Sequence, residues 1–236
     1  MLRNTAFVGS AELALEVALE TPEGQQTILA TLGRGSIVGE MALVDSSPRS
    51  ASVRTLSDVE AVELDRSGFE RMIAGSEPLA RFLLESFVAD LRRTYGLPTA
   101  EWRSGGAEIR SSRRHNSILK RTVYQPGYLF FQQGEPGDTA FLIQSGRVSV
   151  KRDDRELARL GPGRVFGKTS LVLGTRRLAS ASAIEQVICE VIVKTDFDAA
   201  IASMPTIVRV LVKTYAERLQ PGALAKTRLS PPAGSR

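Results

Sequence analysis

The chain contains the same module twice, and this internal repeat constrains its fold more than any other feature. Residues 32–74 align without a gap onto residues 160–202, at a constant offset of 128 positions. The shared identities are glycines, one arginine and several apolar residues, including Gly33/Gly161, Gly35/Gly163, Gly39/Gly167, Arg49/Arg177, Ala51/Ala179, Val59/Val187, Phe69/Phe197 and Ile73/Ile201. Upstream, Thr5 onward pairs with Ala140 onward at an offset of 135, so we expect seven extra residues around Thr21–Gly24 in the first copy. Two copies of one module predict two tandem domains.

Each copy has the pattern of a β-rich domain that ends in helices. Apolar and polar residues alternate over 11–19 and 147–152, as they do in half-buried strands. Glycines at 33, 35, 161 and 163 predict tight turns between strands. A helix is then expected over Ser76–Tyr95 with Ser76 as its N-cap, and a second from Pro205 to Leu219. The prediction is a mainly β chain of two tandem antiparallel jelly-roll-like barrels, each followed by C-terminal helices.

These patterns predict a first domain over 1–95, a linker over 96–117, a second domain over 118–219 and a disordered tail over 220–236. The second copy has a complete entry from Lys120 to about Asp138, to which nothing in the first copy corresponds. We therefore expect the first barrel to be N-terminally incomplete. Either the chain is truncated, or another subunit covers the open sheet edge.

The segment Gly39–Val53, GEMALVDSSPRSASV, has the residues of an anion-binding site. A glycine at 39 lets the backbone approach a ligand closely. If residues 40–43 open a short helix, their free N–H groups favour an anion, and Arg49 supplies a bidentate, charge-assisted hydrogen bond to it. The alternative is a surface ion pair between Glu40 and Arg49 in an ordinary polar loop.

With the second copy's GEPGDTAFLIQSG and LGPGRVFG, this segment resembles the phosphate-binding cassette of the cyclic nucleotide-binding domain family. The resemblance implies a cytoplasmic, non-enzymatic sensor that binds cAMP or cGMP, with cAMP expected first, and signals through the helix after the barrel. It also implies that Glu40 accepts a hydrogen bond from the ribose 2′-hydroxyl. The implied ligand residues of the first domain are Gly39, Glu40, Met41, Ala42, Arg49, Ser50 and Ala51.

The second copy departs from this pattern in FGKTSLVLGTRRLASA, residues 166–181. It keeps Gly167 and Arg177 but places Lys168 at the position of Glu40 and Leu178 at that of Ser50. A lysine donates hydrogen bonds and accepts none, so the ribose acceptor is lost. We expect the site of Gly167, Lys168, Thr169 and Arg177 to be degenerate, with a site retuned for a more anionic ligand as the alternative.

Other features favour a binding protein over an enzyme. His115 is the only histidine, and the chain has no Walker A or dinucleotide fingerprint, so we expect no catalytic set, metal or cofactor. Residues 1–95 carry a net charge of −5 and the rest +10, but the basic residues are spread, so nucleic-acid binding is not expected. One cysteine, Cys189, and no long apolar run indicate a cytoplasmic protein without a membrane segment.

A protein partner or homo-oligomer is expected beside the cyclic nucleotide. Two alternatives to the sensor remain open. One is a regulatory or scaffold subunit with vestigial pockets. The other is part of a Crp-type transcription regulator that lacks its DNA-binding domain, since only 17 residues follow Leu219 and a helix-turn-helix needs about 20.

Overall fold

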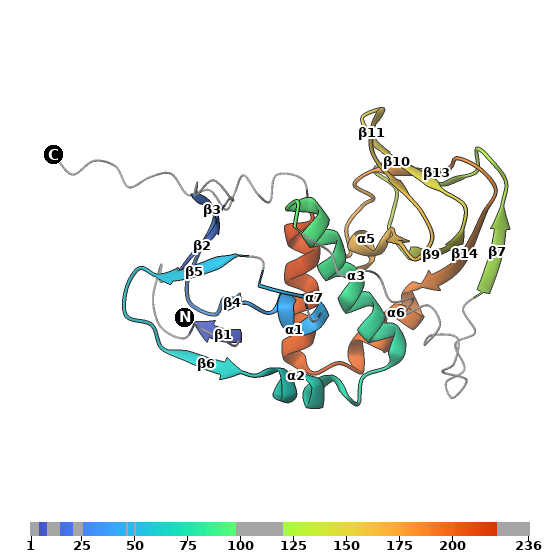
Figure 1. Cartoon of the computed structure of the whole chain (residues 1–236). Helices are drawn as coiled ribbons and strands as arrows, with labels where there is room; N and C mark the ends of the chain where they lie inside the picture. Colours follow the sequence, from blue (N-terminus) through green and yellow to red (C-terminus); the bar gives the residue numbers. More distant parts are fainter. Residues whose placement is uncertain are drawn as a thin grey trace. The chain divides into compact units, whose positions relative to one another are not determined.

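The computed structural model describes residues 5–8, 15–20, 26–45, 47–49, 51–97 and 120–220. It divides into two compact units, coloured in sequence order in Figure 1. Unit 1 comprises residues 1–74, 88–100 and 221–236, and unit 2 comprises residues 75–87 and 101–220. The predicted linker over 96–117 and tail over 220–236 lie almost wholly outside the described residues, and the predicted domain boundaries stay a prediction.

Unit 2 is a jelly roll of two antiparallel four-stranded sheets, in the orders β11-β10-β13-β8 and β12-β9-β14-β7. Its strands are β7 (Lys120–Tyr124), β8 (Leu129–Phe131), β9 (Thr139–Ser145), β10 (Val148–Arg152), β11 (Arg155–Leu160), β12 (Val165–Phe166), β13 (Ser180–Ala183) and β14 (Val187–Val193). Its helices are α5 (Lys168–Leu173), α6 (Lys194–Ala202) and α7 (Thr206–Arg218). The two sheets enclose an aromatic core, in which the Phe141 and Phe166 rings stack with centroids 5.1 Å apart.

Unit 1 repeats this plan with fewer strands, in two three-stranded sheets of order β4-β1-β6 and β3-β2-β5. Its elements are β1 (Thr5–Val8), β2 (Leu15–Glu20), β3 (Gln26–Leu32), β4 (Ile37–Val38), α1 (Met41–Asp45), β5 (Ser52–Thr55), β6 (Ala61–Leu64) and α2 (Arg66–Ile73). Helix α3 (Pro78–Thr94) follows. Leu15 and Val38 form the buried centre, with Val17, Leu32, Val53 and Val59 packed around them. Among the described residues, this cluster has fewer buried members than the aromatic cluster of unit 2.

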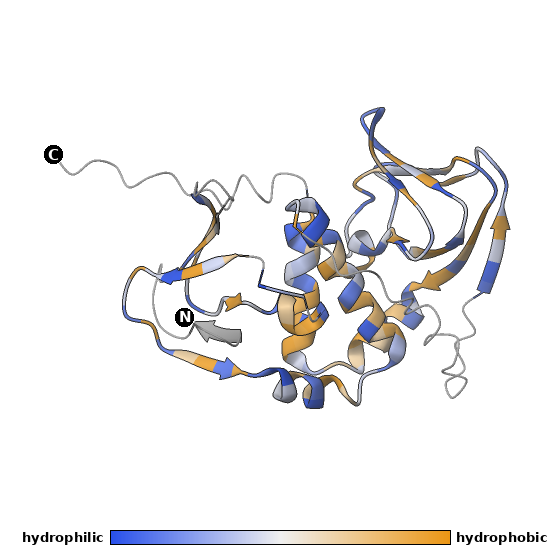
Figure 2. Cartoon of the chain, in the orientation of Figure 1, coloured by the Kyte–Doolittle hydropathy of each residue, from blue (hydrophilic) through white to orange (hydrophobic). Residues whose placement is uncertain are grey.

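The strand registers confirm the repeat. Ala6 lies opposite Val38, and Phe141 lies opposite Phe166, at the predicted offsets of 135 and 128. Helices α2 and α6 begin 128 positions apart, as do α3 and α7. Figure 2 shows hydrophobic and hydrophilic residues alternating along the strands and around α3, which is the pattern that marked both element types in the sequence.

The prediction for the extra residues of the first copy is partly wrong. Leu15 lies opposite Leu32 and Thr55, whereas Val148 lies opposite Leu160 and Ala183. Leu15 therefore corresponds to Val148, at an offset of 133. Two of the seven extra residues fall between β1 and β2, and only five fall between β2 and β3. An ungapped comparison hides this because both segments alternate in polarity, and a shift of two positions preserves the alternation.

The described residues of unit 1 contain no counterparts of β7 and β8. In unit 2 these strands pair with β14 and β13, where Cys189 and Ile192 are fully buried. The corresponding residues of β6 are Ala61, which is exposed, and Leu64, which is half-buried. One edge of β5 and one edge of β6 are therefore without a strand from the described residues, as expected for an incomplete barrel.

Helix α3 begins later than predicted, and Ser76 is not its N-cap. The helix starts at Pro78, and the carbonyl of Glu77 accepts from the Arg81 N–H at 3.2 Å. Proline suits this first position because the N–H that it lacks has no helical partner there. Ser76 is buried, and its hydroxyl has no hydrogen-bond partner. Residues 75–87 pack with unit 2 and residues from 88 pack with unit 1, so this single helix contributes to both units.

Candidate functional site

The first cassette, residues 39–53, begins where β4 ends. Gly39 turns the chain with φ of +75°, and α1 follows over five residues. The Glu40 carbonyl accepts from the N–H groups of Leu43 at 3.0 Å and Val44 at 3.2 Å, so Glu40 is the residue that opens α1. Glu40, Met41 and Ala42 are all buried. The short helix that the anion-site hypothesis assumed over residues 40–43 is therefore present, as Met41–Asp45.

Arg49 lies against this turn. Its Nη1 donates a hydrogen bond to the carbonyl oxygen of Gly39, ten residues earlier. The positive φ favours glycine at position 39, and a Cβ atom there would displace the Arg49 guanidinium from its present place. Arg49 itself is exposed. The structure thus brings together Gly39, Glu40 and Arg49. Ala51 is half-buried beyond the arginine, and Ser50 lies outside the described residues.

The second cassette, residues 166–181, repeats this contact. Gly167 has φ of +79°, and Arg177 Nη1 donates to its carbonyl oxygen at 2.8 Å. Here, however, the arginine is only 3% exposed. Its Nη2 donates to Thr139 Oγ1 at 3.0 Å, and its guanidinium lies 4.1 Å from the centroid of the Phe131 ring. The arginine of the cassette is therefore exposed to solvent in unit 1, as Arg49, and buried in unit 2, as Arg177.

Enclosure changes the electrostatics of Arg177. Burial lowers the pKa of its guanidinium, while the nearby carboxylates of Asp138 and Glu135 act in the opposite direction. Its Nε is buried and has no hydrogen-bond partner. Phe131 belongs to β8, which has no counterpart among the described residues of unit 1. One of the two strands that distinguish the barrels, β8, therefore also supplies the ring that covers the arginine of the second cassette.

The ammonium group of Lys168 is hydrogen-bonded to backbone carbonyls. Its side chain is 3% exposed, and Nζ donates to the carbonyls of Val165 and Ser86, each at 3.3 Å. The same nitrogen lies 5.0 Å from the centroid of the Phe87 ring. Thr169 is half-buried in the first turn of α5. Where unit 1 has a carboxylate, unit 2 therefore has an ammonium bound to the backbone and to a ring of α3.

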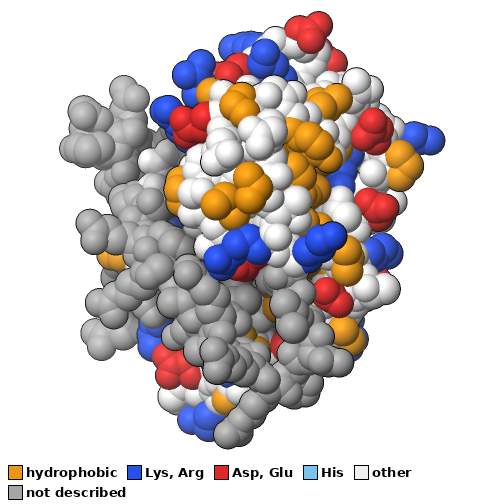
Figure 3. All heavy atoms as spheres, turned by 90° about the vertical axis from the view of Figure 1, so that its right-hand side faces the viewer, with side chains coloured by type: hydrophobic (Ala, Val, Ile, Leu, Met, Phe, Trp, Pro, Cys, Tyr) orange, Lys and Arg blue, Asp and Glu red, His pale blue; other side chains and the backbone are white. Residues whose placement is uncertain are grey.

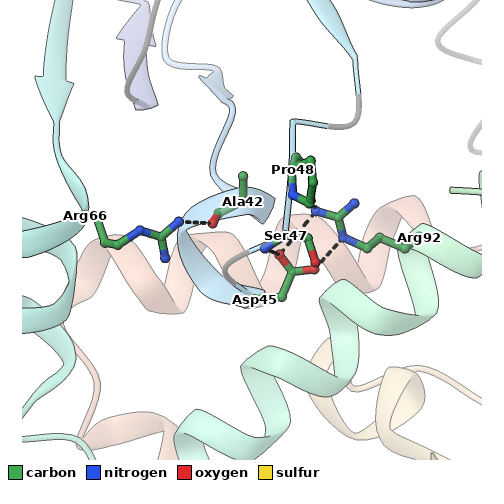
Figure 4. A network of polar contacts seen from close by, with 6 residues as sticks. All are labelled: Ala42, Asp45, Ser47, Pro48, Arg66 and Arg92. Carbon is green, nitrogen blue, oxygen red and sulfur yellow. Dashed lines mark hydrogen bonds and ion pairs between the residues drawn. The ribbon is translucent and has the colours of Figure 1, made fainter. Parts of the chain in front are cut away.

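Sequence reasoning missed the residues that support the first cassette, which Figure 4 shows. Arg92, in the last turn of α3, pairs with both carboxylate oxygens of Asp45, and its Nη2 also donates to the Pro48 carbonyl at 3.3 Å. Arg66 Nη2 donates to the Ala42 carbonyl at 2.8 Å. A signal for the Arg92 pair exists in the repeat, because the positions that correspond to Asp45 and Arg92 are Leu173 and Gln220.

Other chemistry finds little support in the described residues. Among them no three or more His, Cys, Asp or Glu side chains are placed to hold a metal ion. No helix in the described part of the chain is long and apolar enough to cross a membrane. Burial raises the pKa of the Cys189 thiol to about 12, so at neutral pH it is a protonated core group. His115 lies outside the described residues.

Charged side chains are mixed in sign on the face of the molecule shown in Figure 3. Lysines and arginines alternate there with acidic residues around hydrophobic side chains. Three of the ion pairs in unit 2, Arg121–Glu190, Arg147–Glu185 and Arg159–Glu156, join exposed arginines to carboxylates at 2.7 to 3.1 Å. Nucleic acid binds to concentrated positive charge, and this face offers charge of both signs.

A family match and a curated relative both relate this chain to cyclic nucleotide-binding proteins. The family described as cyclic nucleotide-binding domain matches residues 9–76 and 121–204. A cAMP-dependent protein kinase regulatory subunit from Debaryomyces hansenii is 31% identical over 168 residues, which are 70% of this chain and 35% of that subunit. The chain thus spans about a third of the length of this relative.

Two solved structures are also similar. The regulatory domain of Toxoplasma gondii PKA, crystallised with cAMP, is 20% identical, with 92% of this chain and 82% of that chain covered and a TM-score of 0.38. The catabolite activator protein of Thermus thermophilus is 31% identical, with 45% and 50% covered and a TM-score of 0.36.

Proposed function

The chain belongs to the cyclic nucleotide-binding domain family, and on that premise we propose that it is a sensor that binds one cyclic nucleotide, in the first cassette. It is a regulatory module, similar to a kinase regulatory subunit. The proposal adds that Gly39, Glu40, Met41, Ala42, Arg49, Ser50 and Ala51 form the ligand site and that the protein is not an enzyme.

The observation that carries the proposal is the return of Arg49 to the Gly39 turn beside the buried Glu40. A cyclic phosphate carries one negative charge and presents oxygens that accept two parallel hydrogen bonds from a guanidinium. The Gly39 carbonyl accepts from Arg49 Nη1 directly before Glu40, the residue that opens α1. Glu40 supplies an acceptor for the ribose hydroxyl, which inorganic phosphate lacks.

The second cassette supports the count of one site. Arg177 is covered by the Phe131 ring and bonded to Thr139, and Lys168 is bonded to carbonyls of Val165 and Ser86. A ligand there would have to displace these contacts and would meet Lys168 at the position where the first cassette has the Glu40 carboxylate. We therefore propose that Gly167, Lys168, Thr169 and Arg177 form a degenerate site with a structural role.

The ligand proposed first is cAMP, because the named relative is the regulatory subunit of a cAMP-dependent protein kinase. Transmission through α3 is proposed because this helix follows the first barrel and its last turn contacts the first cassette. A cytoplasmic location and a protein partner, such as a kinase catalytic subunit or a second copy of the chain, complete the proposal.

Calorimetric titration of the full chain with cAMP, cGMP and linear 5′-AMP tests this function. We expect cAMP to bind more tightly than cGMP, and 5′-AMP to bind at least about tenfold more weakly than cAMP, because its dianionic, open phosphate fits a different set of donors. If titration with cAMP and with cGMP both released no heat of binding, the sensor function would be contradicted. That result would favour a scaffold subunit with vestigial pockets, with which an exposed Arg49 is also compatible.

A further inference from the structure

The loop that carries Arg49, residues 45–49, is held by the helix that follows the barrel. Arg92 is 1% exposed, and its guanidinium grips the Asp45 carboxylate with two nitrogens. The second of these nitrogens also reaches the carbonyl of Pro48, the residue before Arg49. Asp45 in turn accepts from the Ser47 N–H at 3.0 Å. One buried side chain of α3 thus contacts both ends of the Arg49 loop.

The second cassette supports its arginine in a different way. The Arg177 N–H donates to the Glu135 carbonyl at 2.8 Å, and the Gly134 N–H donates to the Arg177 carbonyl at 2.9 Å. Arg176 Nη1 donates to the Gly134 carbonyl at 2.7 Å. These partners lie in the turn between β8 and β9. Backbone hydrogen bonds from within the barrel fix this loop.

The two supports are alternatives at the level of sequence. The positions that correspond to Asp45 and Arg92 are Leu173 and Gln220, which cannot form an ion pair. Conversely, strand β8 has no counterpart among the described residues of unit 1. The arginine loop of each cassette is therefore held by a different set of contacts. In the first copy these contacts come from the helix after the barrel, and in the second they come from the turn between β8 and β9.

We propose that Arg92 is a positioning residue for the first cassette, and that the Asp45–Arg92 pair couples nucleotide binding at Arg49 to the last turn of α3. This inference rests on the proposed function and deepens it. A ligand that fixes the Arg49 loop also favours the position of α3 in which Arg92 reaches Asp45 and Pro48. Coupling between two sites is reciprocal, so the factor by which the ligand favours this position of α3 is also the factor by which displacement of α3 weakens ligand binding.

The test uses Arg92→Gln, which introduces the residue found at position 220 of the second copy. Arg93→Gln is the matched control, because Arg93 neighbours Arg92 but pairs with Asp90 on the surface of the same helix, at 3.0 Å. The double variant Asp45→Leu/Arg92→Gln removes both partners, so no buried carboxylate is left without its cation if the single variant folds poorly. Hydrogen exchange by mass spectrometry and cAMP titration are measured on the full chain.

Without ligand, we expect faster exchange of the Arg49 loop amides in Arg92→Gln and the double variant, and unchanged exchange in Arg93→Gln. With cAMP, we expect affinity to fall by roughly 5- to 150-fold in Arg92→Gln, the usual range of coupling between sites. We also expect cAMP to slow exchange at residues 88–94 in the parent chain and in Arg93→Gln, but not in Arg92→Gln.

Loop exchange that is unchanged in both Arg92 variants would overturn the inference, as would parental cAMP affinity combined with retained protection of α3. Faster loop exchange in the Arg92 variants, combined with no cyclic nucleotide binding by the parent chain, would instead contradict the proposed function and leave the support of the loop by Arg92 in place. The ligand-free measurement therefore separates the two failures.

Discussion

We expect the substitution Arg49→Ala to lower the affinity of the chain for cyclic nucleotide by at least about 100-fold, because truncating one member of a desolvated, hydrogen-bonded charge pair costs about 2–5 kcal/mol. Arg49 places its guanidinium at the Gly39 turn, where its Nη1 donates to the Gly39 carbonyl oxygen. Alanine removes that charge without altering φ at Gly39 or the helix that Glu40 opens. Calorimetry with cAMP measures the loss directly.

Arg177→Ala is the matched control, because it removes the same side chain from the corresponding position of the second copy. We expect it to leave cAMP affinity within about twofold of the parent, while lowering stability, since the side chain is buried between Gly167, Thr139 and Phe131. The opposite outcome, with binding lost in Arg177→Ala and kept in Arg49→Ala, would place the ligand in the second cassette.

A second large effect is expected on folding. Phe141→Ala should lower the free energy of unfolding of unit 2 by about 3–5 kcal/mol, as is usual when a core aromatic is truncated. Phe141 is 7% exposed, and its ring contacts those of Tyr124, Phe130, Phe131 and Phe166 at centroid distances of 5.1 to 6.3 Å. Removing it leaves a cavity that rigid rings cannot readily fill. Urea denaturation followed by tyrosine fluorescence reports the change.

Leu157→Ala provides the comparison for that experiment, because Leu157 lies on β11 of the same unit but is 47% exposed. We expect a change below about 1 kcal/mol there. Equal denaturation midpoints for the Phe141 variant and the parent would show that the aromatic cluster does not hold the two sheets together.

Most of the architecture could be predicted because it depends on local sequence patterns, and because these patterns occur in both copies of the repeat. Positive φ at Gly39 and Gly167 favours glycine, so the shared glycines marked the turns that open both cassettes in the sequence. Alternating polarity located β10, and helical spacing located α7. The offset of 128 also relates the helices of the two copies, since α3 begins at Pro78 and α7 at Thr206, although the sequence pattern predicts the start of α3 at Ser76.

The rest depends on contacts between residues far apart in the chain. Serine is a residue type that is common at the N-cap, but tertiary packing buries Ser76. The Glu77 N–H donates instead to Ser203 Oγ at 3.1 Å. No pattern in the sequence indicates that Lys168 reaches Ser86, 82 positions away. Arg92 and Asp45 are 47 positions apart, and only their replacement in the second copy distinguishes them from ordinary surface charges.

Counting the nucleotide bound per chain at saturation tests the central claim most directly. Equilibrium dialysis of the full chain against radiolabelled cAMP, at concentrations well above the dissociation constant, gives that number without any substitution. We expect one cAMP per chain, bound by the cassette that keeps Glu40 and an exposed Arg49. Two per chain would mean that Arg177 and Lys168 give up their internal contacts to bind ligand, and would contradict the degenerate second cassette.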